Sequence, residues 1–217
     1  MKTMGITGKA NLNVAPDQTK VSLTIRGFAM KYSAALEQSV RDTKVIKDAL
    51  EECGIERTSL KTENFYTSEK TKSVEDQYGN ISYRHIGYDI THYLNFKFDN
   101  NNELLGKVLS VLSKLKINPR IAISFTVKDS EQYKDKLIAL AITDAKRKAC
   151  TMASAAEVIL GEIQQIDYSY QTINLESKQY LYLECARENS TADDFNVDMT
   201  PEDMDLTDTV TIEWEIK

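Results

Sequence analysis

The sequence contains few of the residues on which catalytic and metal sites depend. Its 217 residues include 2 His and 3 Cys, and neither a Gly-rich phosphate-binding loop nor a His-Glu-x-x-His or Gly-x-Ser-x-Gly motif is present. His85 and His92 stand seven positions apart on one predicted strand and therefore point to opposite faces, so they do not share a metal ion. We assign no catalytic, cofactor-binding or metal-ligating residue, expect no cofactor, and expect the protein not to be an enzyme.

The few cysteines do not form a disulfide framework. Cys53, Cys150 and Cys185 are odd in number, widely spaced and without a Cys-x-x-Cys pair, which favours reduced structural thiols. Cys150 stands beside three basic residues, Lys146, Arg147 and Lys148, but its place in a helical pattern predicts a residue packed in the core.

Long apolar runs are absent. No stretch of about 18 apolar residues occurs, which excludes a membrane-spanning helix. The N-terminus passes directly into an alternating pattern and lacks the apolar region of roughly seven residues that a signal peptide needs. We therefore expect a cytoplasmic location, with the periplasm or cell envelope as the alternative if a leader was removed.

The net negative charge is distributed unevenly along the chain. The net charge is −6, and residues 186–208 alone contain eight acidic residues and one basic residue, so the remainder is nearly neutral. A nearly neutral surface does not attract phosphate backbones, and we expect no nucleic-acid partner. Because residues 186–208 lack the ligand spacing and central glycine of a calcium loop, we predict that they form an acidic mobile loop before the last strand.

The clearest positive signal is a period-two pattern between Ile86 and Phe98. Apolar or aromatic residues occupy every second position of this stretch except at His92, which predicts a long strand with one buried face. We interpret His92 as a partly buried, hydrogen-bonded histidine. A ligand or pH-sensing role is the alternative.

Helical and strand patterns alternate along the rest of the chain. Helices are predicted at 32–53, closed by Gly54, at 104–115, and from Asp129 or Ser130 to about Ala156. The last helix carries a stripe of alanines spaced four apart, which would let it lie close to a sheet: Ala141, Ala145, Ala149 and Ala153. Strands are predicted at 6–14, 21–29, 57–68, 86–98, 121–127, 163–170 and 210–216, with a further one near 180–183. A polar connection, 69–80, would join two of them in a long hairpin.

The order β-β-α-β-β-α-β-α-β-β predicts an α+β protein, in which helices pack on one face of largely antiparallel sheet. We expect a single domain over residues 1–217, built from two intimately packed subdomains, with residues 61–128 as the inner one. Strand–helix–strand occurs twice, which suggests two plait-like halves. Nine tyrosines in or beside predicted strands are interpreted as ordinary sheet packing, with an oligomer contact as the alternative: Tyr66, Tyr78, Tyr83, Tyr88, Tyr93, Tyr168, Tyr170, Tyr180 and Tyr182.

Several short motifs occur in an order that resembles the SIMPL family. Residues Ile6–Asp17 contain the spacing Gly-x-Ala-x-x-x-x-x-Pro-Asp with which the family begins. Further matches follow in chain order at Ala34-Ala35, Gly54-Ile55, Gly87-Tyr88, Lys148-Ala149, Leu160–Ile163 and Thr209–Ile216. The resemblance implies a mainly bacterial protein of unknown function, similar to periplasmic immunogenic and oxidative-stress-defence proteins. Members of the family are often exported, and some are similar to ring-forming oligomers. No agreed catalytic residue comes with it.

These observations predict a non-enzymatic interaction or oligomeric assembly protein with a link to stress. We expect a homo-oligomer with an unidentified protein partner. The alternative is a small-molecule-binding protein or an enzyme that uses a cleft between the two halves, for which His92 beside a carboxylate would be the best candidate.

Overall fold

The computed structural model describes residues 2–75, 77–168, 175–177, 181–183 and 199–217. The chain forms two compact units. Unit 1 comprises Met1–Asp17, Thr126–Ser177 and Pro201–Lys217, and unit 2 comprises Gln18–Phe125 and Lys178–Thr200. The chain therefore passes from one unit to the other at four points. The first predicted helix lies in unit 2, together with residues 61–125, which make up most of the predicted inner subdomain 61–128.

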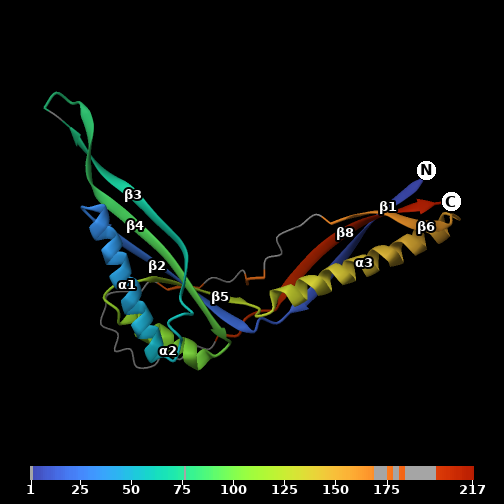
Figure 1. The fold of residues 1–217 in the computed structure, drawn as a ribbon, viewed down its shortest axis with the longest axis horizontal. Coiled ribbons are helices and arrows are strands. Elements are labelled where there is room, and N and C mark those ends of the chain that lie inside the picture. Colours follow the sequence, from blue (N-terminus) through green and yellow to red (C-terminus); the bar gives the residue numbers. More distant parts are fainter. Residues whose placement is uncertain (1, 76, 169–174, 178–180, 184–198) are drawn as a thin grey trace. The chain divides into compact units, whose positions relative to one another are not determined.

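Unit 1 is a three-stranded antiparallel sheet with one long helix (Figure 1). The strand order is β1-β8-β6, where β1 is Thr3–Val14, β8 is Met204–Ile216 and β6 is Leu160–Asp167. Helix α3 (Ser130–Ala155) begins at Asp129, whose side chain accepts the backbone N–H of Gln132. Its buried residues lie against the alternate buried positions of β1 and β8.

The predicted alanine stripe is the contact surface of α3. All four alanines are buried, and a Cβ built on Gly8 of β1 would lie 2.0 Å from the backbone oxygen of Ala141. The helix backbone therefore touches the strand backbone, which only small residues permit. The larger core residues lie around this contact: Ile6, Val14, Leu137, Leu206, Val210, Ile212 and Trp214.

Charges on α3 also cover the outer edge of β1. The backbone N–H of Lys9 donates to Asp144 Oδ2 at 3.0 Å, and Lys148 Nζ donates to the backbone oxygen of Thr7 at 3.2 Å. The Lys148 and Arg147 side chains and this backbone N–H hold the pKa of Asp144 well below its usual range. An edge whose polar groups are bound in this way is a poor template for pairing with another chain.

Unit 2 is a five-stranded sheet with helices α1 (Tyr32–Glu52) and α2 (Asn102–Ser113). The strand order is β3-β4-β2-β5-β7, and the β3–β4, β2–β4 and β5–β7 pairs are antiparallel. The five strands are β2 (Gln18–Ala29), β3 (Lys61–Glu75), β4 (Ile81–Asp99), β5 (Arg120–Thr126) and β7 (Leu181–Leu183).

The core of unit 2 lies between the two helices and the buried positions of β2, β4 and β5. Every second residue of β4 from Ile90 to Phe96 is buried, as the alternation predicted, and His92 is among them. The other members include Val21, Leu23, Ile46, Leu50, Leu105, Leu112, Ile121 and Ile123. Helix α1 ends where predicted, with Gly54 at a positive φ of 84°.

The predicted hairpin of β3 and β4 is longer than the sequence pattern indicated. The polar stretch 69–80 was predicted as a connection, but β3 continues to Glu75 and β4 starts at Ile81. Figure 1 shows the two strands running on past the start of α1. Both faces of this extension are exposed, and its sequence therefore lacks the apolar alternation by which half-buried strands are recognised.

The predicted fold class is confirmed, since both sheets are largely antiparallel and the helices pack on them. The predicted short strand near 180–183 is β7, and the last strand starts at Met204, so the end of the predicted acidic loop is strand. Residues 184–198 of that region lie outside the described residues. Both strand–helix–strand passages fall in unit 2 and therefore do not mark the two units. No described helix is long and apolar enough to cross a membrane.

Candidate functional site

His92 lies at the centre of β4, between β2 and β3. Its Cα partners are Ile25 on β2 and Phe65 on β3, and α1 covers its side chain. Period-two alternation turns His92 to the same face as Ile90 and Leu94, so the imidazole is directed into the sheet–helix layer and is only 8% exposed. The Phe65 ring meets it edge to face, with centroids 5.2 Å apart.

Both ring nitrogens of His92 have hydroxyl partners. Ser39 Oγ lies 2.9 Å from Nδ1, and Thr62 Oγ1 lies 3.1 Å from Nε2. Thr43, one helical turn after Ser39, lies 3.4 Å from Nδ1 and donates its hydroxyl to the Ser39 backbone oxygen. A neutral imidazole donates through one nitrogen and accepts through the other, and this set of hydroxyls serves either tautomer.

The surroundings favour neutral His92. Burial lowers the pKa of His92 from its ordinary value of 6.5, because the imidazolium would lose hydration and no carboxylate compensates through a hydrogen bond. The interpretation of His92 as a buried, hydrogen-bonded residue agrees with these contacts.

A hollow of about 390 Å³ opens above His92 at the flank of α1. We call it the His92 groove. It is lined by three cationic side chains, two hydroxyls, a valine and the imidazole: Lys44, Lys47, Arg57, Ser39, Thr43, Val40 and His92. Its size is that of a pocket for a small metabolite, and it lies within unit 2.

Arg57 enters the groove from the turn that follows α1. Its Nη1 donates to Asp48 and, at 2.9 Å, to Glu51, so two acids of α1 hold the guanidinium at the mouth of the hollow. On the other side of His92, a cavity of about 10 Å³ is lined by Asp42 and Gln38 among others, which is room for one water. Burial raises the pKa of Asp42.

The contact of Ser39 with His92 brings a nucleophile and a base together, but the part of the chain that the structure describes does not supply the other groups of a hydrolytic site around it. The second nitrogen of His92 faces the hydroxyl of Thr62, whereas a triad places a carboxylate there to stabilise the imidazolium. Ser39 is also buried inside α1, where backbone N–H groups are committed to the helix. The arrangement therefore fixes the α1–β4 contact and presents cations to a hollow.

None of the other described candidate residues from the sequence lines this groove. His85 is exposed on β4 and its Nδ1 lies 3.9 Å from Glu69. Cys150 is exposed, so the prediction that it packs in the core is wrong: the alanines occupy the buried stripe of α3, and position 150 falls next to that stripe. Cys185 lies outside the described residues. Among those that are described, no group of three or more His, Cys, Asp or Glu side chains could hold a metal.

Apart from His92, the lining residues of the groove were not identified from the sequence. Ser39, Thr43 and Lys47 recur at four-residue steps and so share one helical face, which is a readable signal. The contribution of Arg57 depends on the turn after Gly54 and has no local sequence signal.

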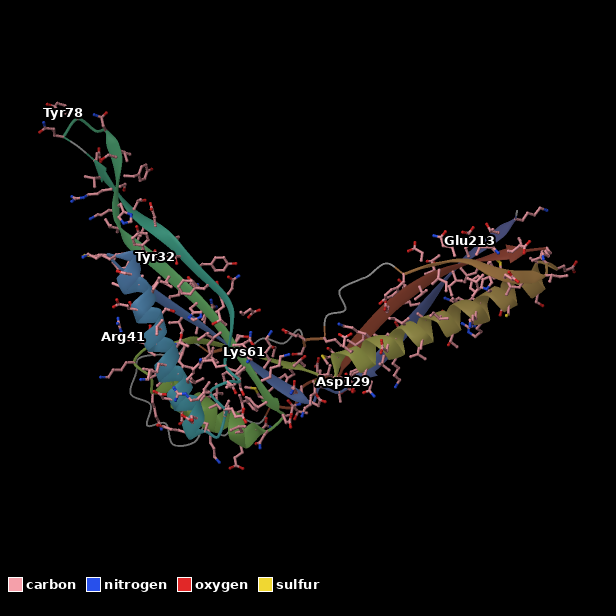
Figure 2. All side chains as sticks on the ribbon, in the orientation of Figure 1. Tyr32, Arg41, Lys61, Tyr78, Asp129 and Glu213 are labelled. Carbon is pink, nitrogen blue, oxygen red and sulfur yellow. The ribbon has the colours of Figure 1, made fainter. Side chains whose placement is uncertain are left out.

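A second exposed region is the free end of the β3–β4 hairpin. We call residues 71–75 and 77–86 the arm. From Ile81 to Gly87, β4 pairs only with β3, because β2 ends its pairing at Tyr88. Every described residue from Ser68 to His85 is exposed, including the apolar side chains of Ile81 (65%) and Tyr83 (76%). Tyr78 lies at the tip (Figure 2).

The architecture is that of an α+β protein with two sheet-and-helix units, and the described residues around His92 do not include a carboxylate hydrogen-bonded to its ring. The chain belongs to the SIMPL family, described as a protein of unknown function (DUF541), whose sequence model matches residues 4–214. It is also similar to the uncharacterized protein YggE of Edwardsiella ictaluri (strain 93-146), with 25% identity over 191 residues that cover 86% of this chain and 76% of the relative. Both matches agree with the family resemblance seen in the sequence.

Proposed function

We propose that the protein is a non-enzymatic assembly module whose copies associate through the arm. The observation that supports this proposal is that the arm extends beyond the rest of its sheet with apolar side chains exposed on it. An isolated two-stranded ribbon is at best marginally stable in water, and three strands or a packed face are needed for independent stability. A partner that covers the arm supplies that support.

The arm suits a second copy of the same chain because its edge is self-complementary. β3 is the last strand of its sheet, so its outer edge is available over its length among the described residues. Antiparallel pairing of two β3 strands about a two-fold axis between Lys70 and Thr71 sets Glu69 of one copy opposite Lys72 of the other. The edge of β1, by contrast, is occupied by Asp144 and Lys148 of its own chain.

Light scattering coupled to size-exclusion chromatography tests this proposal over a range of protein concentrations. The wild type is expected to elute with a mass above the 24.6 kDa of one chain. The double variant Ile81→Ser/Tyr83→Ser removes apolar area that association would bury, at about 25 cal/mol per Å², and is expected to shift the protein to the monomer.

The matched control is Ile163→Ser/Ile166→Ser, which removes two exposed isoleucines from β6 and is expected to leave the mass unchanged. A wild type that stays at 24.6 kDa at the highest concentration overturns the proposal. So does an arm variant that folds, as judged by circular dichroism, and keeps the wild-type mass. The link to stress is supported by the family resemblance alone. The arm variant and its control, which are expected to differ only in assembly, would allow that link to be examined.

A further inference from the structure

The His92 groove holds lysines whose usual acidic partners are engaged elsewhere. On a helix, a lysine commonly pairs with an acid four residues away. Lys44 and Lys47 have Asp48 and Glu51 at that spacing, but both acids bind Arg57. Among the described residues, neither lysine forms an ion pair, so two ammonium groups line the hollow without a bound counter-charge.

The same groove offers neutral hydrogen-bond donors beneath these charges. Neutral His92 donates to one of its two closest hydroxyls and accepts from the other. In the tautomer that carries its proton on Nδ1, Ser39, which lines the groove, accepts from the ring and keeps its own proton for another acceptor. Arg57 uses only Nη1 in its bonds to Asp48 and Glu51, and a guanidinium has further N–H groups on Nη2 and Nε.

We propose that the His92 groove binds a small organic molecule through its phosphate group. A phosphate presents several acceptor oxygens and up to two negative charges, which match two ammonium groups, an anchored guanidinium and the Ser39 hydroxyl better than a single carboxylate does. Val40 supplies an apolar wall for the organic part, and the volume of about 390 Å³ leaves room for it. The groove is formed within unit 2, so this site does not depend on assembly through the arm.

Inorganic pyrophosphate is the probe, with inorganic phosphate and acetate as weaker comparisons at constant ionic strength. Isothermal titration calorimetry of the full chain is expected to give saturable 1:1 binding of pyrophosphate with a dissociation constant of about 1 mM or tighter. Phosphate should bind more weakly and acetate should not saturate. In ¹⁵N spectra, the shifts should concentrate at residues 39–47, at Arg57 and at the His92 ring.

The decisive variant is Lys44→Gln/Lys47→Gln, which is expected to weaken pyrophosphate binding by at least about tenfold. Lys114→Gln/Lys116→Gln is the matched control, because it removes two exposed lysines of the same unit and changes the net charge equally. It should alter the constant less than twofold. The proposal is overturned if pyrophosphate does not saturate, if the spectral shifts lie elsewhere, or if both double variants weaken binding equally while remaining folded.

Discussion

The contact between Gly8 and α3 predicts a large effect of a single methyl group. In Gly8→Ala the new Cβ would lie 2.0 Å from the Ala141 backbone oxygen and 2.7 Å from the Ala145 backbone nitrogen. Real Cβ atoms do not approach backbone atoms so closely, and neither contact atom belongs to a flexible side chain that could turn away. The helix must therefore move off the strand or the strand must bend.

Movement of α3 would loosen the packing of residues that are now fully buried, such as Ala145 and Ala149. Overpacking in a core commonly costs about 1–3 kcal/mol, and a clash between two backbones belongs at the upper end of that range. We expect a loss of about 3 kcal/mol in the free energy of unfolding. With a urea m-value of about 2 kcal/mol/M, the transition midpoint would fall by about 1.5 M.

Trp214 provides the assay for this prediction. It is the single tryptophan of the chain, lies on β8 in unit 1 and is 3% exposed, so its fluorescence follows the unit that contains Gly8. Gly5→Ala is the matched control on the same strand, because a Cβ at Gly5 meets nothing within 4 Å. It should be neutral or stabilise by less than about 1 kcal/mol through the reduced freedom of the unfolded chain.

Two outcomes would refute this reasoning. One is a Gly8→Ala variant with the wild-type midpoint, which would mean that the helix and strand are not in backbone contact. The other is an equal loss of stability in Gly5→Ala, which would mean that any side chain added to β1 has this effect and that the close approach at Gly8 is not its cause.

Two further predictions concern unit 2, beside those for the arm and the groove. Because burial lowers the pKa of His92, the unfolded chain takes up a proton first as the pH falls below 6.5. The free energy of unfolding should then decrease by up to about 1.4 kcal/mol per pH unit between pH 7 and 5, and His92→Gln should lack this decrease in urea titrations at each pH. Gly87 has a φ of 150°, and a Cβ there would lie 2.6 Å from the Ala29 backbone oxygen, so Gly87→Ala should lose about 1–3 kcal/mol. Urea unfolding followed by far-UV circular dichroism checks this loss, and an unchanged midpoint would contradict it.

The elements that the sequence predicted correctly are those with one buried face and one exposed face. A strand or helix that buries one face carries a readable period, and for this reason β4 from Ile90 to Phe96 and the alanine stripe of α3 were placed correctly. Most of the arm was predicted as a polar connection and not as strand, because neither of its faces is buried. Similarly, β8 was predicted to start later than Met204, since its first residues alternate with acids that looked like part of a loop.

The His92 site shows where sequence reasoning ends. That His92 is partly buried and hydrogen-bonded followed from one polar position in an apolar row. Its partners come from α1 and β3, and the choice of Ser39 and Thr62 depends on how the helix lies across the sheet. Cys150 illustrates the same limit in the opposite direction, because helical periodicity placed it in the core whereas the buried stripe passes one residue earlier, at Ala149.

Charged residues on the two long helices have different consequences for what each unit can bind. On α3, Asp144 accepts from Lys148, Arg147 and a backbone N–H of β1, so opposite charges neutralise one another and cover a strand edge. On α1, Asp48 and Glu51 are drawn to Arg57, which leaves two lysines beside a hollow without an acid. Ion pairs at exposed sites contribute little stability. The pairing of Arg57 with the two acids of α1 therefore matters less for stability than for the positive charge that it leaves on Lys44 and Lys47. The two sheets differ in a similar way: side chains of α3 cover the edge of β1, whereas the outer edge of β3 is open among the described residues, and this difference is why we propose association through unit 2.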